Sequence, residues 1–310
     1  MSALICGSIA YDTIMVFPDH FKNHILPEKV HILNVSFMVP EMRREFGGCA
    51  GNIAYNLKLL HGQGMPMGTV GKDFDNYAAW MDSRGVLRDH IKVIDDVFTG
   101  QAFITTDLDD NQITAFHPGA MSYSHENKVT DADNISIGII SPDGRDGMLQ
   151  HAAQFHDEGI PFIFDPGQGM PMFNGDELKK FIEQASWVCV NDYEWEMMQK
   201  ETGYSPHEVA EHIRALIITK GAQGAVIYTS DKQHSIPVAK VEKLVDPTGC
   251  GDAFRAGLLY GLMNDMDWEV TGRLASLMGA IKIEHHGTQN HSFDKTYLEN
   301  RFKDSFGFEL

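Results

Sequence analysis

Residues 187–219 read WVCVNDYEWEMMQKETGYSPHEVAEHIRALIIT, and they show a pattern that the chain repeats. An apolar run at 187–190 precedes a helical pattern at 192–201, and a second apolar run lies at 216–219. Short continuous apolar runs are typical of parallel strands that are buried on both faces. Similar runs lie at 3–9, 137–140 and 161–164, and further helical patterns at 50–60, 76–83, 147–156, 252–263 and 269–284. This alternation predicts an α/β fold, with a doubly wound and mostly parallel sheet flanked by helices.

Two stretches interrupt the alternation, at 12–39 and 91–116. Both have an extended, β-rich pattern, and the second contains a polar hairpin tip at 107–111. Because both leave the alternation early in the chain, we expect them to form one small β-sheet lid over the open edge of the main sheet. The chain has neither an internal repeat nor a low-complexity linker, so we predict one domain, 1–310, that carries this lid.

The composition of the 310 residues excludes several classes of protein. Apolar residues make up 43% of the chain, enough to build a sizeable core, and the net charge is −18. An acidic surface repels phosphate backbones, so nucleic acid is not an expected partner. No apolar run is long enough to cross a membrane, and the four cysteines are scattered without a CxxC pair. We therefore expect a cytoplasmic protein with reduced thiols, no signal peptide and no membrane partner.

The segment Asp246-Pro-Thr-Gly-Cys-Gly-Asp252 runs directly into a predicted helix. The small residues Gly249, Cys250 and Gly251 let a ligand approach the backbone, and the helix directs free N–H groups and the positive end of its dipole to the same place. This arrangement predicts an anion hole. Asp252 can take a proton from a hydroxyl while the N–H groups hold the charge on a transferring phosphoryl group. A glycine-rich turn with an aspartate cap explains the segment as well.

A second glycine-rich segment, Gly47-Gly-Cys-Ala-Gly-Asn52, also opens a predicted helix. Its glycines, Gly48 among them, expose backbone N–H groups, and the Asn52 amide both donates and accepts hydrogen bonds, as sugar hydroxyls require. The alternative is a helix start that needs tight backbone geometry. Asp12 follows the first strand, at the carboxyl edge where sheets of this class bind ligands, although an aspartate after a strand is also a common turn residue.

Polar residues also follow two later strands, in Asn191-Asp-Tyr-Glu194 and Thr219-Lys-Gly-Ala-Gln-Gly224. Glu194 and Asn191 are suited to organise Mg²⁺ through water, because this ion keeps several water ligands and takes few carboxylates. Thr219 and Gly221, in the segment that Gly224 ends, are placed to receive phosphate oxygens. Capping of the following helix explains Asn191 equally well.

Together and in this order, these motifs resemble the PfkB (ribokinase-like) family of carbohydrate and nucleoside kinases. The likeness runs from Cys6-Gly-Ser-Ile-Ala-Tyr-Asp12 through Thr69-Val-Gly-Lys-Asp73 and the 191–194 motif to Gly287. Its most specific element is the 246–252 segment, a form of the family's second signature, and 47–52 matches the first. The resemblance implies a ribokinase-like fold and a transfer of the γ-phosphoryl group of ATP, dependent on Mg²⁺, to a primary hydroxyl of a bound sugar.

The resemblance also implies a role for each matching residue. Asp252 would act as the base, and the N–H groups of 249–251 would form the anion hole. The remaining assignments are Asp12, Gly48 and Asn52 on the sugar hydroxyls, Asn191 and Glu194 on the Mg²⁺ side, Thr219, Gly221 and Gly224 near the nucleotide, and Asp246 and Thr248 at a monovalent cation such as K⁺.

Within the family, the 246–257 segment and His117-Pro-Gly-Ala-Met121 look most like bacterial and archaeal nucleoside kinases of the adenosine-kinase-like branch. Arg255 departs from the small or apolar residue common in sugar kinases. On a helix it shares a face with Asp252, so it is placed to pair with that carboxylate or to reach phosphate oxygens of the nucleotide. A plain salt bridge is an equally good explanation.

The leading hypothesis is a kinase that converts a purine ribonucleoside to its 5′-monophosphate. Flat apolar contacts for a purine are available in and beside the lid from Phe37, Phe103, Phe116 and Met121, although such residues are also ordinary core. The exposed edges of a lid favour pairing with a second copy, so a homodimer is a further expectation.

Two alternatives remain open. The first is a kinase for a non-phosphorylated sugar; a phosphorylated sugar is disfavoured because the lid offers few lysines, Lys22, Lys29 and Lys92, against several acids. The second is a non-catalytic, nucleotide-binding regulator on the same fold. An intact Asp252 beside an intact glycine turn argues against this second alternative, because binding alone needs no base.

Overall fold

The main layer of the protein is a nine-stranded sheet with the strand order β13-β12-β11-β10-β9-β8-β1-β4-β5. The computed structural model describes residues 2–25, 32, 34–109 and 111–310. The strands are β1 (Ser2–Cys6), β4 (Gln63–Val70), β5 (His90–Val93), β8 (Ile135–Ile140), β9 (Phe162–Phe164), β10 (Trp187–Asn191), β11 (Ala215–Thr219), β12 (Ala225–Tyr228) and β13 (Gln233–Ile236). Neighbours from β11 to β5 pair in parallel, and β12 and β13 add an antiparallel edge.

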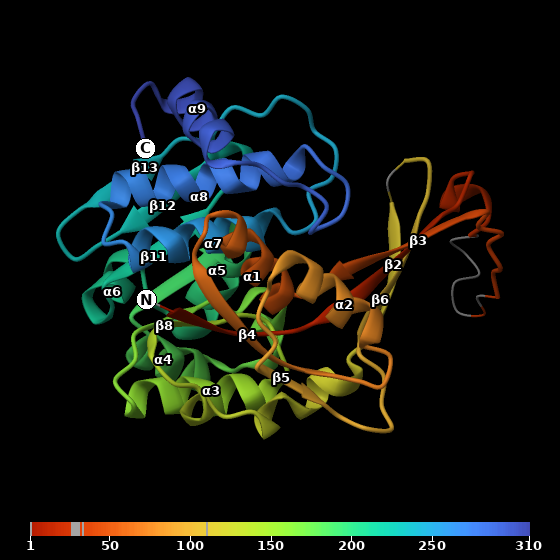
Figure 1. Ribbon diagram of the computed structural model, residues 1–310, viewed down its shortest axis with the longest axis horizontal. Coiled ribbons are helices and arrows are strands. Elements are labelled where there is room, and N and C mark those ends of the chain that lie inside the picture. Colours follow the sequence, from red (N-terminus) through yellow and green to blue (C-terminus); the bar gives the residue numbers. More distant parts are fainter. Residues whose placement is uncertain (1, 26–31, 33, 110) are drawn as a thin grey trace.

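Helices cover both faces of this sheet (Figure 1). They are α1 (Cys49–Leu59), α2 (Asp75–Arg84), α3 (Arg145–Asp157), α4 (Gly175–Gln184), α5 (Asp192–Thr202), α6 (Pro206–His212), α7 (Cys250–Met263), α8 (Trp268–Ile283) and α9 (Lys295–Phe306). Side chains alternate along each strand: Ile5 and Ile217 enter a core that includes residues of α1, α2, α7 and α8. Leu4 and Leu216 enter a second core with residues of α3 to α6. Apolar residues at every strand position are needed to fill both cores, so the predicted α/β class is confirmed.

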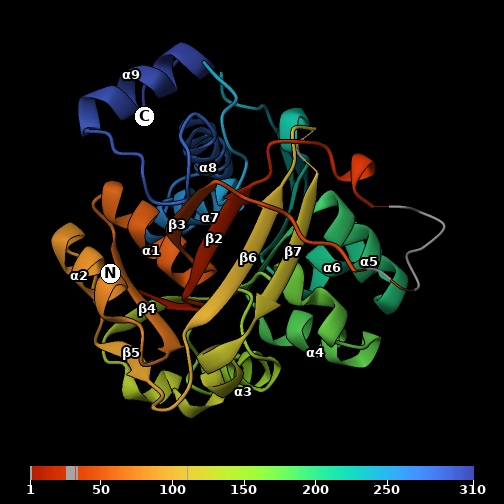
Figure 2. The ribbon, with the colours of Figure 1, turned by 90° about the vertical axis from the view of Figure 1, so that its right-hand side faces the viewer.

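A separate four-stranded sheet, in the order β3-β2-β6-β7, lies beside the main layer (Figure 2). Its strands are β2 (Ala10–Val16), β3 (Glu41–Gly47), β6 (Gly100–Thr106) and β7 (Gln112–His117). The strands of this small sheet therefore differ in their limits from the two predicted segments. β3 begins after residue 39, and residues 91–93 belong to β5, because their backbone pairs with β4 in the main sheet. Residues 26–31, 33 and 110 of those segments lie outside the described residues.

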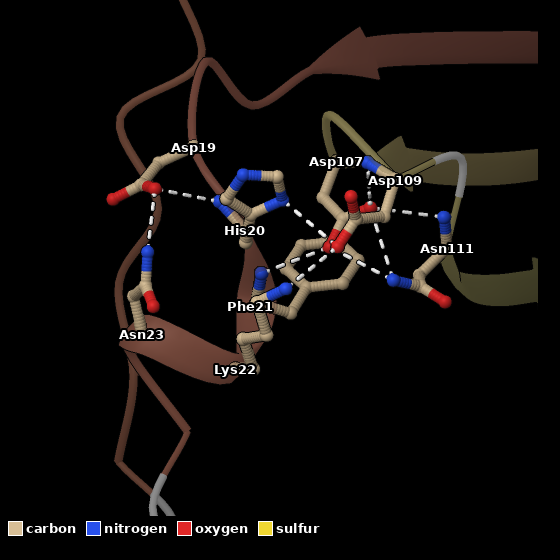
Figure 3. Close-up of polar contacts among 8 residues, drawn as sticks. All are labelled: Asp19, His20, Phe21, Lys22, Asn23, Asp107, Asp109 and Asn111. Atoms are coloured by element: carbon tan, nitrogen blue, oxygen red, sulfur yellow. Dashed lines mark hydrogen bonds and ion pairs between the residues drawn. The ribbon is translucent and has the colours of Figure 1, made fainter.

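Asp107 joins the two segments of the small sheet at their tips (Figure 3). One carboxylate oxygen, Oδ2, accepts a hydrogen bond from the N–H of Phe21 at 2.9 Å, and Oδ1 accepts from the N–H of Asn111 at 2.9 Å. Lys22 adds an ion pair with Asp109 at 3.0 Å. Burial opposes the charge on Asp107, but these donors more than compensate and lower its pKa to about 2. The two segments are therefore connected by side chains as well as by strand pairing.

In the part of the chain that the structure describes, no helix has both the length and the apolar character that crossing a membrane requires.

Candidate active site

The backbone of the turn before α7 requires glycine at position 249 but not at position 251. Gly249, the N-cap, has φ +78°, and a Cβ atom there would lie 2.9 Å from Cγ2 of Thr288. Gly251 lies inside the helix, where a Cβ atom would lie 3.3 Å from Nη1 of Arg255. Packing and backbone conformation therefore require glycine at position 249, whereas at position 251 a Cβ atom would meet only the end of the Arg255 side chain.

The N–H groups that can receive an anion at this helix end are not the same three that were predicted to form the anion hole. The N–H of Cys250 donates to the main-chain oxygen of Pro247 at 3.2 Å, which closes the turn. Gly251 and Asp252 are in the first helical turn, where N–H groups have no acceptor within the helix. These two N–H groups, with the helix dipole behind them, form the part of the turn that can receive an anion.

Asp252 is partly buried and is held by Asn52. Its Oδ2 accepts a hydrogen bond of 2.7 Å from Nδ2 of Asn52, which comes from the first turns of α1. Burial raises the pKa of Asp252 to about 6; the Asp165 carboxylate adds to that rise and the Asn52 hydrogen bond opposes it. A carboxylate with a pKa close to neutrality is ionised at pH 7 and is still basic enough to accept a proton.

Asn52 belongs to a buried network that sequence reasoning missed. Its Oδ1 accepts from Nε2 of Gln289 at 3.0 Å. Gln289 accepts in turn from Nε1 of Trp80 at 3.0 Å and donates to the hydroxyl of Tyr77 at 2.5 Å. The Tyr77 hydroxyl donates to the main-chain oxygen of Gly47 at 2.9 Å. Asn52, predicted to bind sugar hydroxyls, is therefore also a positioning residue for Asp252.

Asp12 lies on β2 and is also partly buried. Its partner across the strand pair is Glu45. Burial, together with the carboxylates of Glu45 and Asp246, raises the pKa of Asp12 to about 6. A Cβ atom at Gly47 would lie 2.6 Å from Oδ2 of Asp12, so the glycine leaves this carboxylate uncovered. Gly48 has φ +86° and packs against the backbone of residues 8–10. This agrees with the alternative interpretation of the segment as a helix start that needs tight backbone geometry.

The strand register separates two of the three phenylalanines that were expected to contact a base. Ala102 lies opposite Asp12 on β2 and opposite Phe116 on β7, so these three residues share one face of the small sheet. Phe103 follows Ala102 and points to the other face. Phe116, which is 51% exposed, is therefore on the same face of the small sheet as Asp12, and Phe103 is not.

The other residues expected to contact a base lie apart from β6 and β7. Met121 is half-buried in a 3₁₀ segment, Gly119–Glu126, whose main chain approaches Gly144 after β8. Phe37 packs with Phe17 and Phe21, at ring-centroid distances of 4.8 and 5.1 Å. Lys92 pairs with Glu126 at 2.8 Å, and Lys29 lies outside the described residues.

Arg255 pairs with Asp165, not with Asp252. Its Nε and Nη2 donate to the two carboxylate oxygens of Asp165 at 3.0 and 2.8 Å, and both side chains are buried. Burial opposes the charge on Arg255, but the Asp165 carboxylate more than compensates and raises the arginine pKa. Asp165 follows β9 at the carboxyl edge of the sheet. Arg255 therefore forms a salt bridge, as one of its interpretations expected, but the partner is Asp165, which the sequence did not indicate.

Asn191 and Glu194 form a capping box at the start of α5. Oδ1 of Asn191 accepts from the N–H of Glu194 at 2.7 Å, and the two oxygens of Glu194 accept from Asn191 at 2.8 Å each. Burial raises the pKa of Glu194, and the Asp165 carboxylate adds to that rise. Each Glu194 oxygen keeps a lone pair, so an oxygen donor set of the kind that Mg²⁺ takes through water is present.

The turn after β11 places the remaining nucleotide candidates. The Thr219 hydroxyl donates to the main-chain oxygen of Val190 at 3.4 Å. Gly221 has φ +52° and open space where a Cβ atom would be, whereas Gly224, with φ +83°, lies against the oxygen of Ile236. Gly221 therefore leaves room for a ligand beside its Cα atom, and Gly224 is required by the packing of the turn.

Asp246 is buried, and each of its carboxylate oxygens accepts a backbone N–H group. Its Oδ1 accepts from the N–H of Thr248 at 2.9 Å and its Oδ2 from the N–H of Gly287 at 3.0 Å. These hydrogen bonds tie the start of the glycine turn to the loop after α8.

Comparisons with known proteins show the family to which the chain belongs. The model of the pfkB family of carbohydrate kinases matches residues 11–295. The structure of Burkholderia thailandensis nucleoside kinase in complex with inosine is 51% identical, with a TM-score of 0.91 over 99% of each chain. A structure of the same protein in complex with ADP-inosine is 52% identical, with a TM-score of 0.89 over 99% of this chain and 97% of that one.

Two further relatives extend the likeness. A nucleoside kinase of Methanocaldococcus jannaschii is 31% identical over 266 residues, which are 85% of this chain and 87% of that protein. Ribokinase from Thermotoga maritima, 20% identical with a TM-score of 0.78 over 98% of this chain and 99% of that one, shows that the fold is ribokinase-like. Because the family match extends over nearly the whole chain, the protein belongs to the pfkB family of carbohydrate kinases and is a kinase with an alcohol group as acceptor.

Proposed function

We propose that the protein transfers the γ-phosphoryl group of ATP to the 5′-hydroxyl of a purine ribonucleoside, such as inosine, adenosine or guanosine, with Mg²⁺ as cofactor. The observation that carries this proposal is Asp252, a carboxylate with a pKa of about 6 at the N-terminus of α7, oriented by Asn52. The B. thailandensis structure with inosine, 51% identical to this chain, supports a nucleoside as the acceptor. Its structure with ADP-inosine supports ATP as the donor.

Asp252 removes the proton of the 5′-hydroxyl as the hydroxyl oxygen attacks the γ-phosphorus. The bond from that phosphorus to the bridging oxygen breaks, and ADP leaves. The N–H groups of Gly251 and Asp252 hold the negative charge of the transferring group, where the dipole of α7 adds to their effect. Glu194 and Asn191 would hold Mg²⁺ through water, and the ion, when bound, would neutralise phosphate charge.

In this proposal Asp12 binds the ribose. Its carboxylate can accept hydrogen bonds from two adjacent hydroxyls, and Gly48 and Asn52 would complete the contacts with the sugar. When the nucleoside binds, the partly buried Asp12 carboxylate loses contact with water, and the ribose hydroxyls replace that water as donors. An analogue that lacks a hydroxyl therefore leaves the carboxylate without one of its hydrogen bonds. Phe116, on the same face of the small sheet, supports an apolar contact with the base.

The small sheet is proposed to close over the bound nucleoside as a lid. It carries Asp12 and Phe116, and closing would keep water from the phosphoryl group. Every residue of β7, an edge strand, is exposed, which supports a homodimer formed through the lid. The free thiols of all four cysteines support a reducing compartment, the cytoplasm.

The test is kcat/KM for ADP release with inosine, adenosine, 2′-deoxyadenosine, ribose and fructose under one set of conditions. The 2′-deoxynucleoside should lose about 5- to 150-fold relative to adenosine, which corresponds to about 1–3 kcal/mol for an unpaired polar group. Ribose should be poorer still, because it lacks the contacts of the base. If ribose or fructose matches the best nucleoside, the protein is a sugar kinase instead. If no acceptor releases ADP, a non-catalytic role takes its place.

A further inference from the structure

Lys282 is a completely buried lysine at the end of α8, directly behind the glycine turn. Its Nζ donates to the main-chain oxygens of Asp246 at 2.8 Å and His285 at 3.1 Å. Within the described residues, no carboxylate oxygen lies in ion-pair range of this ammonium group. A buried charge that contacts only carbonyl oxygens is unusual, because lysine is rarely buried unless it is paired.

The two carbonyl groups belong to segments that meet behind the candidate anion hole. Asp246 begins the turn that leads to Gly249 and α7, and His285 begins the loop after α8. The N–H of Asp246 donates to the main-chain oxygen of Ile283 at 3.1 Å, and Thr288 packs on Gly249. The ammonium group therefore links both segments at their crossing.

The charges around Lys282 favour its protonated form. Burial lowers the pKa of Lys282, but the carboxylates of Asp246, Asp252 and Glu45 oppose that lowering. These three carboxylates stand on three different elements, in the turn before α7, in α7 and in β3. The ammonium group of Lys282 therefore offsets the negative charge of these carboxylates close to the glycine turn, where the phosphates of bound ATP would add further negative charge.

The residues present do not fit a monovalent cation at Asp246 and Thr248, because the ammonium group of Lys282 already donates to the main-chain oxygen of Asp246. A second cation beside the ammonium group would be repelled by about 4 kcal/mol at 4 Å in a medium of effective dielectric 20.

We infer that the ammonium group of Lys282 takes the place of a monovalent cation behind the glycine turn, so that the enzyme works without added K⁺. The inference rests on the kinase activity proposed above. It assigns Lys282 the positioning of the turn that carries Gly251 and Asp252, through the two carbonyl groups that it joins.

The first experiment needs no variant. The wild-type enzyme is assayed with inosine and Mg-ATP supplied as tetramethylammonium salts, and K⁺ or Na⁺ is then added. Its kcat/KM should change by no more than about twofold. A rise of about tenfold or more with K⁺ would show that a cation binds in addition to Lys282, and the inference would be wrong.

The second experiment removes the charge and keeps the bulk. Lys282→Met should lower kcat/KM by about tenfold or more, and K⁺ or NH₄⁺ should restore part of the loss by entering between the two carbonyl groups. Its melting temperature should also rise with K⁺ or NH₄⁺ but not with tetramethylammonium, whereas the wild-type value should respond to none of them. Lys303→Met, at an exposed lysine in the last turn of α9, is the matched control and should behave as wild type.

Lys282→Gln separates charge from hydrogen bonding, because it keeps two N–H donors. A fully active Lys282→Gln enzyme, or a Lys282→Met enzyme whose activity and melting temperature both ignore K⁺ and NH₄⁺, would overturn the inference. If Lys282→Met does not fold, the wild-type assay and the Gln variant decide. If the wild-type protein phosphorylates no acceptor, the proposed function fails, and the melting comparison alone decides the role of Lys282.

Discussion

A methyl group added at Gly251 separates the catalytic role of the glycine turn from its structural role. The new Cβ atom would lie 3.3 Å from Nη1 of Arg255, the guanidinium nitrogen that does not bind Asp165. The backbone of Gly251 is helical, and alanine is preferred to glycine in helices by up to about 1 kcal/mol. The free energy of unfolding of Gly251→Ala should therefore equal the wild-type value or exceed it by up to about 1 kcal/mol.

The same methyl group stands where the phosphoryl group would approach the N–H groups of Gly251 and Asp252. Loss of one such donor typically costs about 10²–10³ in kcat, or about 2.7–4 kcal/mol. We expect a loss of this size in Gly251→Ala, measured as kcat with saturating inosine and ATP. Urea unfolding of the same preparation provides the stability.

Gly249→Ala is the matched control, because it adds the same methyl group two residues earlier. There φ is +78° and the Cβ atom would lie 2.9 Å from a Thr288 carbon, so this variant should lose about 1–3 kcal/mol of stability. A Gly251→Ala enzyme with wild-type kcat would refute the assignment of these N–H groups to the phosphoryl group. Gly251→Ala with the instability expected of Gly249→Ala would show instead that the whole turn is structural.

Three further predictions concern the base and the lid. Asp252→Asn should lower kcat by about 10²–10⁴-fold while inosine still binds within a few-fold of wild type by calorimetry, and near-wild-type kcat would remove Asp252 from the mechanism. With the Asp252 pKa at about 6, kcat/KM should be level above neutrality and fall about tenfold per pH unit well below 6; a level profile down to pH 5 would contradict a base with that pKa. Inosine should slow hydrogen exchange within 12–39 and 91–116, and unchanged exchange in both segments would argue against closure of the lid.

The sequence was most informative where one local pattern determines one element. The apolar runs that became β1, β8, β9, β10 and β11 fill two cores at once, so their central residues are apolar. The missed β4 contains Pro66 and two glycines. The missed β12 is an apolar run of only four residues, and β13, at the edge of the sheet, alternates between exposed and buried residues. α4 was missed although Asn174 and Glu177 form a capping box that is visible in the sequence.

The candidate site was predictable only as far as its local motifs extend. Asp252 and its helix stand in one short segment, and the glycines around them indicate their role. The partners of the site are distant in the chain: Asp165 lies 90 residues before Arg255, and Gln289 lies 237 residues after Asn52. Nothing near Asp165 or Gln289 marks either residue, because each acquires its partner only when the fold brings strand ends and loops together.

The burial of Asp12 and Asp252 also contributes to the way the stability of the whole protein depends on pH. Burial raises the pKa of each carboxyl from 3.8 to about 6. Between these values the unfolded chain releases its protons first, so the free energy of unfolding falls as pH rises towards 6 and stays lower above it. Each carboxyl accounts for roughly 3 kcal/mol of that fall. A nucleoside that donates hydroxyls to Asp12 recovers part of the loss, so the supply of substrate would set how much of the protein survives proteolysis at neutral pH.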